Sequence, residues 1–129
     1  MIKCFKNKFQ WVFFQIAFFC GHGPECDIFD SRKALEIAKY NVENYYSVVG
    51  ILEKWQETLQ VFESYLPAYF KDVRKVYKEY MNEKIVNSNN IKPKIPQYIK
   101  DRIAANFTME IEFYEFCKQR FHKQLLAIQ

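Results

Sequence analysis

The placement of glycine most limits how this chain can fold, because none of its three glycines comes after Gly50. Glycine supplies the positive-φ conformations that tight turns require. A long stretch without glycine has few positions at which the backbone can reverse sharply, and it favours helices. With 129 residues, 50% of them hydrophobic, the chain is long enough for one modest domain with its own core.

Apolar residues recur every three or four positions in two segments before residue 67, as in helices that bury one face. Ser31 is a suitable N-cap for the first helix, which is expected to end near Tyr45. Its predicted buried face contains Ala34, Ile37 or Ala38, Val42 and Tyr45. The second segment, residues 52–66, has the clearest stripe, which consists of Leu52, Trp55, Leu59, Phe62 and Leu66.

Three further helices are expected from Pro67 onward, because proline ends one helix and suits the first turn of the next. The first of them is predicted to bury Phe70, Val73, Val76 or Tyr77, and Tyr80. A short helix is predicted near residues 97–105 and a last one over residues 109–127, with Thr108 as its N-cap. Residues 82–96 contain two prolines and no periodicity, so they are predicted to be irregular.

Two segments have the composition of short buried strands. "YYSVVG" (residues 45–50) is rich in β-branched and aromatic residues and is closed by glycine. "WVFFQIAFF" (residues 11–19) fits either a buried strand or the apolar part of a signal peptide over residues 1–20, since three lysines precede it. The run is too short to span a bilayer. We therefore expect a mainly α-helical fold with one or two short strands.

The segment "CGHGPEC" (residues 20–26) allows a metal site, a disulfide or two free thiols. A zinc site of Cys20, His22 and Cys26 would lack a fourth ligand and the usual spacing, so no metal is expected. A Cys20–Cys26 disulfide is geometrically easy, because glycines and a proline let the backbone double back. Two free buried thiols are the alternative. The glycosylation sequon at Asn106 is consistent with a secretory context.

Charge is distributed unevenly along the chain, although the net charge is only +4. Residues 25–66 carry eight acidic and four basic side chains, whereas residues 70–102 carry nine basic and four acidic ones. The basic segment could attract an anion such as a phosphate, a nucleic acid or a sulfated sugar, or be an ordinary solvated face. The chain contains neither of the glycine-rich phosphate-binding motifs, G-x-x-x-x-G-K-[ST] and G-x-G-x-x-G.

Four motifs succeed one another over residues 15–123: "QIAFFCGHGPEC", "SRKALEIAKYN", "VVGILEKWQETLQVFESYLPAYF" and "MEIEFYEFCKQRF". None of them is specific alone. Their ordered succession resembles the C-terminal part of the heparan sulfate 2-O-sulfotransferase and uronyl 2-sulfotransferase family. The resemblance implies the C-terminal part of an α/β, P-loop-like sulfotransferase fold, of which residues 1–129 would form a single partial domain.

The family resemblance also implies a reaction. Members transfer a sulfo group from 3′-phosphoadenosine 5′-phosphosulfate to the 2-hydroxyl of a uronic acid in a glycosaminoglycan of the heparan or dermatan type. The family's phosphosulfate loop and its histidine base lie upstream of the residues present here. No catalytic residue is therefore expected within the chain, and the chain alone is expected to be inactive. The resemblance further implies a Cys20–Cys26 disulfide, a location in the Golgi lumen or at the Golgi membrane, and no membrane anchor within the chain.

By resemblance, a loop that begins at Tyr77 covers the sulfo donor. Tyr77 matches the family, Lys78 stands at a basic position, and Lys92 lies near another, so these three are the predicted cofactor-binding residues. The family's glycine and its substrate-facing arginine are missing, and Val86 stands near the arginine position. Lysines in an irregular segment suit phosphate or sulfate as point charges, with ordinary solvated lysines as the alternative.

The expected partner is a sulfated glycosaminoglycan, and no nucleic acid is expected. A homo-oligomer is compatible with the resemblance, since the family includes trimeric members. The alternative function is a secreted, non-catalytic helical module that binds anionic glycans, with residues 1–20 as a cleaved signal.

Overall fold

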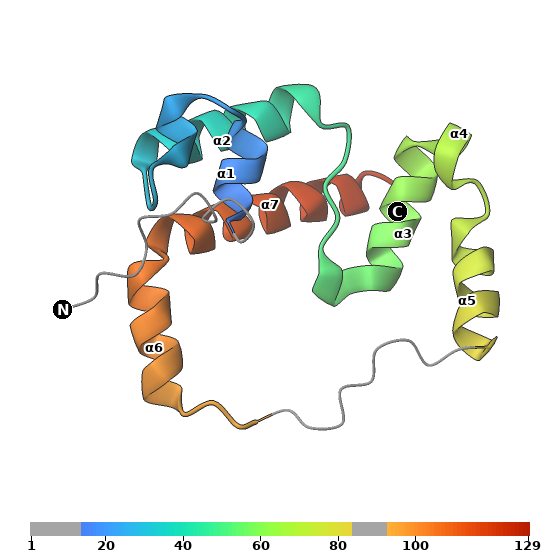
Figure 1. Cartoon of the computed structure of the whole chain (residues 1–129). Coiled ribbons are helices and arrows are strands. Elements are labelled where there is room, and N and C mark those ends of the chain that lie inside the picture. Colours follow the sequence, from blue (N-terminus) through green and yellow to red (C-terminus); the bar gives the residue numbers. More distant parts are fainter. Residues whose placement is uncertain (1–13, 84–92) are drawn as a thin grey trace. The chain divides into compact units, whose positions relative to one another are not determined.

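Helices make up the regular structure of the part of the chain that can be described. The computed structural model describes residues 14–83 and 93–129, and none of these residues belongs to a β-strand (Figure 1). The expectation of a mainly helical chain is confirmed, whereas neither predicted strand is found in the described part. The chain divides into two compact units, which contain described residues 14–46 and 101–116 in the first, and 47–83, 93–100 and 117–129 in the second.

The first unit is built around helix α2 (Arg32–Tyr45). Helix α1 (Gln15–Cys20) packs against α2, and a 3₁₀ turn, η2 (Pro24–Asp27), lies between them in the chain. Ser31 caps α2 as predicted, because its Oγ accepts a hydrogen bond from the Ala34 N–H at 3.3 Å. The buried apolar side chains of this unit are Ile16, Cys20, Cys26, Ala34, Leu35, Ala38, Val42 and Phe113.

The predicted buried face of α2 is right except at its end. Ala34, Ala38 and Val42 are buried, as helical spacing requires. Tyr45 is 72% exposed, because the helix ends at this residue and its ring lies beside Tyr40, with the two centroids 6.0 Å apart.

Residues 15–20 form helix α1, so the strand predicted for this apolar run is wrong where the structure describes it. Residues distant in the sequence stabilise this helix at both ends. The carboxylate of Glu110 accepts hydrogen bonds from the N–H groups of Gln15 at 3.1 Å and Ile16 at 3.3 Å. At the other end, the Asn41 amide donates to two carbonyl oxygens of the last turn. Side chains from other elements thus satisfy both ends of a helix that is too short to be stable alone.

The second unit contains three helices that follow one another. They are α3 (Trp55–Tyr65), α4 (Pro67–Phe70) and α5 (Val73–Glu83), with a 3₁₀ turn, η3 (Leu52–Lys54), before α3. Pro67 is the first residue of α4, as predicted. Asp72 then adopts the left-handed conformation with φ of 59°, which ends one helical segment and allows the next to start in a new direction.

The segment "YYSVVG" does not form the predicted strand. Tyr45 still belongs to α2, and residues 46–51 belong to no strand in the described part. Thr58 holds the end of this segment, because its Oγ1 accepts from the Ile51 N–H and donates to the Ile51 carbonyl oxygen, both at 2.9 Å. One buried side chain therefore satisfies the backbone groups that a neighbouring strand would otherwise satisfy.

Helix α3 buries a face different from the predicted stripe. Leu59 is buried as expected, but Leu52 is 76% exposed. Thr58 and Val61 complete the buried set of α3. Leu52 belongs to η3, and a 3₁₀ turn has three residues per turn, so Leu52 does not continue the α-helical stripe.

Helix α5 is less buried than predicted. Val73 and Tyr77 are half-buried, whereas Val76 is 58% and Tyr80 is 49% exposed. The half-buried side faces α3, where the rings of Tyr77 and Trp55 lie 5.7 Å apart. Val76 and Tyr80 lie one turn apart and form an exposed apolar strip on α5.

Two further helices agree closely with their predicted ranges, namely α6 (Gln97–Asn106) and α7 (Thr108–Leu126). The predicted N-cap of α7 is wrong, because Thr108 is already its first residue and the carbonyl of Phe107 accepts the first helical bond, from Ile111. The Asp30 carboxylate supplies the cap instead, by accepting a hydrogen bond from the Met109 N–H at 2.9 Å.

Several predictions concern residues outside the described part. They are the signal-like residues 1–13, most of the predicted irregular segment, Val86 and Lys92. Residues 93–96, which are described, are irregular as expected. Among the described helices, none combines the length and the apolarity that crossing a bilayer requires.

Candidate functional site

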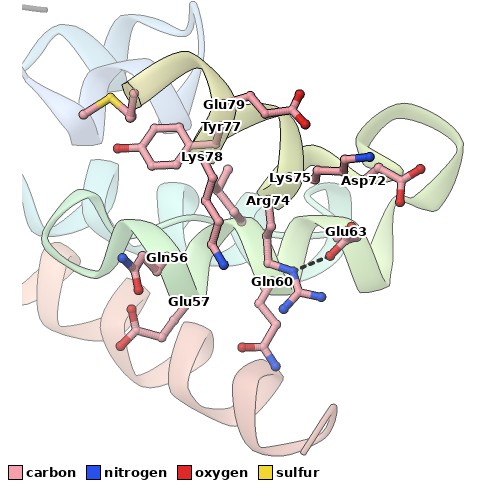
Figure 2. A pocket seen from close by; sticks show the side chains of 12 residues that line it. Gln56, Glu57, Gln60, Glu63, Asp72, Arg74, Lys75, Tyr77, Lys78 and Glu79 are labelled. Atoms are coloured by element: carbon pink, nitrogen blue, oxygen red, sulfur yellow. Dashed lines mark hydrogen bonds and ion pairs between the residues drawn. The ribbon is translucent and has the colours of Figure 1, made fainter. Parts of the chain in front are cut away.

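A hollow of about 1140 Å³ lies between α3 and α5 in the second unit (Figure 2). The residues that line it are Gln56, Glu57, Leu59, Gln60, Glu63, Asp72, Arg74, Lys75, Tyr77, Lys78, Glu79 and Met81. Two of the three predicted cofactor-binding residues, Tyr77 and Lys78, therefore line one hollow. The third, Lys92, lies outside the described residues.

Two side-chain contacts hold α5 against α3 beside this hollow. Arg74 forms an ion pair with Glu63 (Figure 2), and partly exposed pairs of this kind contribute about 0–1 kcal/mol. The Tyr77 ring lies 5.7 Å from the Trp55 ring with the planes tilted by 57°, a geometry that adds about 0.5–1.5 kcal/mol beyond burial. Together these contacts determine which side of α5 faces α3.

Lys78 extends from α5 toward α3 in Figure 2. It is exposed and forms no ion pair with any described residue. The same is true of Lys75, whereas Arg74 is paired with Glu63. A lysine that is not neutralised by a neighbour can meet a phosphate or sulfate group as a point charge. Lys78 and Lys75 are therefore the two basic side chains of this hollow available to an anion, and of these Lys78 extends toward α3.

The hollow as a whole is not a phosphate cradle. Its lining includes four carboxyl side chains, which are Glu57, Glu63, Asp72 and Glu79, against three basic ones. 3′-Phosphoadenosine 5′-phosphosulfate carries several negative charges, so these carboxylates would repel its phosphates inside the hollow. The residues present fit one contact with the edge of such a donor, made by Lys78 beside Tyr77.

The sequence interpretation missed the α3 side of the hollow. Gln56, Gln60 and Glu63 recur at spacings of four and three, which places them on one helix face. That spacing was the one feature of the sequence from which a shared polar face on α3 could have been predicted. The sequence does not show that this face meets α5, because the turn at Asp72, which directs α5 back onto α3, has no clear signature.

The predicted disulfide between Cys20 and Cys26 is confirmed, with the two Cα atoms 5.6 Å apart and both residues buried. Gly21 has φ of 110°, a conformation that L side chains rarely adopt, so the loop needs glycine there. His22 is exposed. Among the described residues, no three potential metal ligands lie together.

Asn106, the predicted glycosylation residue, lies in the first unit at the last position of α6. Its side chain is exposed, and its Nδ2 donates to the Arg102 carbonyl oxygen at 2.7 Å. The hydroxyl of Thr108 donates to the Asp30 carboxylate at 3.2 Å.

Comparisons with known proteins identify relatives of this chain. No protein-family model matches it. It is 40% identical to the uronyl 2-sulfotransferase homolog pip of Drosophila melanogaster over 118 residues, which are 88% of this chain and 23% of that protein. It is 36% identical to human uronyl 2-sulfotransferase over 113 residues, which are 86% of this chain and 28% of the relative.

A third relative is a heparan sulfate 2-O-sulfotransferase, the other kind of enzyme that the motifs resembled. The chain is 35% identical to heparan sulfate 2-O-sulfotransferase 1 of Gallus gallus over 111 residues, which are 85% of this chain and 31% of the relative. The chain thus spans 23–31% of the length of these curated relatives. Over most of its length, this chain is homologous to one part of the uronyl and heparan sulfate 2-O-sulfotransferases, as its ordered motifs predicted.

Proposed function

We propose that this chain forms the C-terminal portion of a glycosaminoglycan uronosyl 2-O-sulfotransferase. The observation that carries the proposal is 40% identity to a uronyl 2-sulfotransferase homolog over 88% of the chain. The donor is 3′-phosphoadenosine 5′-phosphosulfate, which supplies the sulfo group, and the acceptor is the 2-hydroxyl of a uronic acid. The chain alone is inactive in this proposal, because it lacks the donor's phosphate loop and the base.

The exposed apolar side chains of the second unit support the view that this chain is part of a larger domain. Tyr69 is 85% exposed, and Val76 and Tyr80 form the exposed apolar strip on α5. Large apolar side chains that gather on one side of an element commonly mark a surface that another part of a protein covers. We propose that the rest of the sulfotransferase domain covers this strip.

Within that domain, Lys78 contacts a phosphate or the sulfo group of the donor, and Tyr77 packs beside it. Lys78 forms no ion pair with a described residue, which supports this role, as does the Trp55–Tyr77 contact that orients α5. The disulfide supports a luminal location such as the Golgi, because disulfides persist in oxidising compartments.

The decisive experiment is a chimera. This chain replaces the 113 aligned residues of human uronyl 2-sulfotransferase, and binding of 3′-phosphoadenosine 5′-phosphate and sulfo transfer to dermatan and heparan acceptors are measured. We expect both activities. Lys78→Ala should weaken binding of the nucleotide by about 10- to 100-fold, since a charge-assisted contact is worth about 1.5–3 kcal/mol. Lys71→Ala is the matched control, because Lys71 is an exposed lysine just before α5 that does not line the hollow.

A folded chimera that neither binds the nucleotide nor transfers sulfate would contradict the proposal. Retention on heparin that weakens between about 0.05 and 0.5 M salt, without transfer, would favour the alternative of a non-catalytic module that binds anionic glycans. If Lys78→Ala and Lys71→Ala weaken nucleotide binding equally, Lys78 does not contact the donor.

A further inference from the structure

We propose that Asn106 carries an N-linked glycan, attached before α7 docks onto Asp30. Asn106-Phe107-Thr108 is the only Asn-x-Ser/Thr triplet in the sequence. The inference rests on the proposed function to the extent that the chain must enter the secretory lumen. The structure adds to the sequence motif by placing each of its three residues in a different environment.

The first residue of the triplet faces solvent. Asn106 ends α6, and neighbouring positions 102–105 are exposed as well. Its Nδ2 makes one hydrogen bond, to the carbonyl oxygen of Arg102. An N-linked asparagine keeps one N–H, so a glycosylated Asn106 can still donate that bond. A sugar attached here leaves the buried core of the first unit unchanged.

The second and third residues are fixed by the fold. The Phe107 ring lies 5.3 Å from Phe29 and 5.9 Å from Phe14, in an aromatic cluster of the first unit. The Thr108 hydroxyl and the Met109 N–H both donate to the carboxylate of Asp30. In the folded chain, therefore, the hydroxyl that makes this triplet an acceptor is already bonded, and the asparagine amide is bonded within α6.

These contacts set the order of events. The host's glycosylation enzyme supplies an oligosaccharide linked to a lipid pyrophosphate. The Nδ2 atom of Asn106 forms a bond to the first sugar carbon, the bond from that carbon to the lipid pyrophosphate oxygen breaks, and Nδ2 releases one proton. The Thr108 hydroxyl is free to take part in this step only while it is not yet bonded to Asp30.

The test uses the full chain, fused to a cleavable signal sequence and secreted from a eukaryotic cell line. Treatment with a peptide N-glycosidase should remove one glycan and convert Asn106 to aspartate, which mass spectrometry detects. Asn106→Gln and Thr108→Ala should abolish the glycan, and Thr108→Ser should retain it. Asn44→Gln is the matched control, because Asn44 is exposed and makes the same bond four residues back, at 2.7 Å, but no serine or threonine follows two positions on.

Secreted protein that has its Cys20–Cys26 bridge closed and an unmodified Asn106 would overturn the inference. A glycan that survives Asn106→Gln would do so too. Asp30→Ala removes the group that binds Thr108, so it should leave occupancy equal or higher, and a fall in occupancy would refute the proposed order. The chimera's sulfo transfer is measured separately, so the glycan can fail while the sulfotransferase proposal stands.

Discussion

Gly50 lies so close to Thr58 that the structure has no room for a Cβ atom at this position. A Cβ built at Gly50 would lie 2.3 Å from the Thr58 Cγ2 and 3.1 Å from the Phe62 ring. Thr58 is also the residue that binds the Ile51 backbone with both its donor and its acceptor. Any side chain at Gly50 must therefore push Thr58 away from Ile51 or shift the backbone.

We expect Gly50→Ala to destabilise the chain by about 1–3 kcal/mol, the usual cost of overpacking a buried site. The measurement is the free energy of unfolding in urea. Gly23→Ala is the control, because its added Cβ would lie 3.1 Å from the carboxyl end of Glu25, a side chain that can move. The control should change stability by no more than about 0.5 kcal/mol. Equal losses in the two variants would show that Thr58 does not hold the Ile51 segment.

At the scale of elements, the first turns of α7 carry two glutamates with opposite electrostatics. Burial raises the pKa of Glu110, against the hydrogen bonds from Ile16 and Gln15, and the nearby Asp30 charge raises it further. Lys39 lowers the pKa of Glu112, with Arg32 acting in the same direction against burial. Glu112 lies 2.8 Å from each of these two basic groups. One helix end thus holds α1 through Glu110 and α2 through Glu112.

These opposite shifts predict opposite pH dependences. The folded chain binds the Glu110 proton more readily than the unfolded chain does, so wild type should gain stability relative to Glu110→Gln as pH falls from neutral through the raised pKa toward 4.5. Glu112 stabilises the fold above its ordinary value of 4.5, and wild type should lose its advantage over Glu112→Gln as pH falls below that value through the lowered pKa. Urea midpoints at several pH values test both. If lowering the pH changed the stability of wild type relative to both variants in the same direction, the opposite pKa shifts of Glu110 and Glu112 would be contradicted.

At the scale of the whole molecule, the exposed apolar strip on α5 is a feature that a self-contained helical domain would be expected to bury. We expect Val76→Ser combined with Tyr80→Ser to change the stability of the chain itself by no more than about 0.5 kcal/mol per site, because both side chains are exposed. In the chimera, where the strip would be covered, the same pair should cost at least about 2 kcal/mol. Thermal melts of both proteins provide the measurement, with Lys71→Ala as the neutral control. A chimera as tolerant as the chain alone would show that the strip stays exposed.

Local patterns predicted much of the helical structure. The Ser31 cap, the proline at the start of α4 and the ranges of α6 and α7 follow from interactions between residues a few positions apart. For Cys20 and Cys26, local geometry only allowed a disulfide, and the family resemblance predicted the pairing that the structure shows. Of the candidate site, the family resemblance identified Tyr77 and Lys78, and the described structure places both at one hollow.

The sequence by itself therefore determined the positions of α2, α6 and α7 and the start of α4, since those outcomes depend on near neighbours. Only the tertiary structure decided that residues 15–20 are helical, because the acceptor for their first N–H groups is Glu110, more than ninety positions away. It also decided that residues 46–51 have no strand partner in the described part, that Asp30 caps α7, and that Glu63 meets Arg74. Each of these depends on groups that the folded backbone brings together, and no periodicity along the chain encodes that distance.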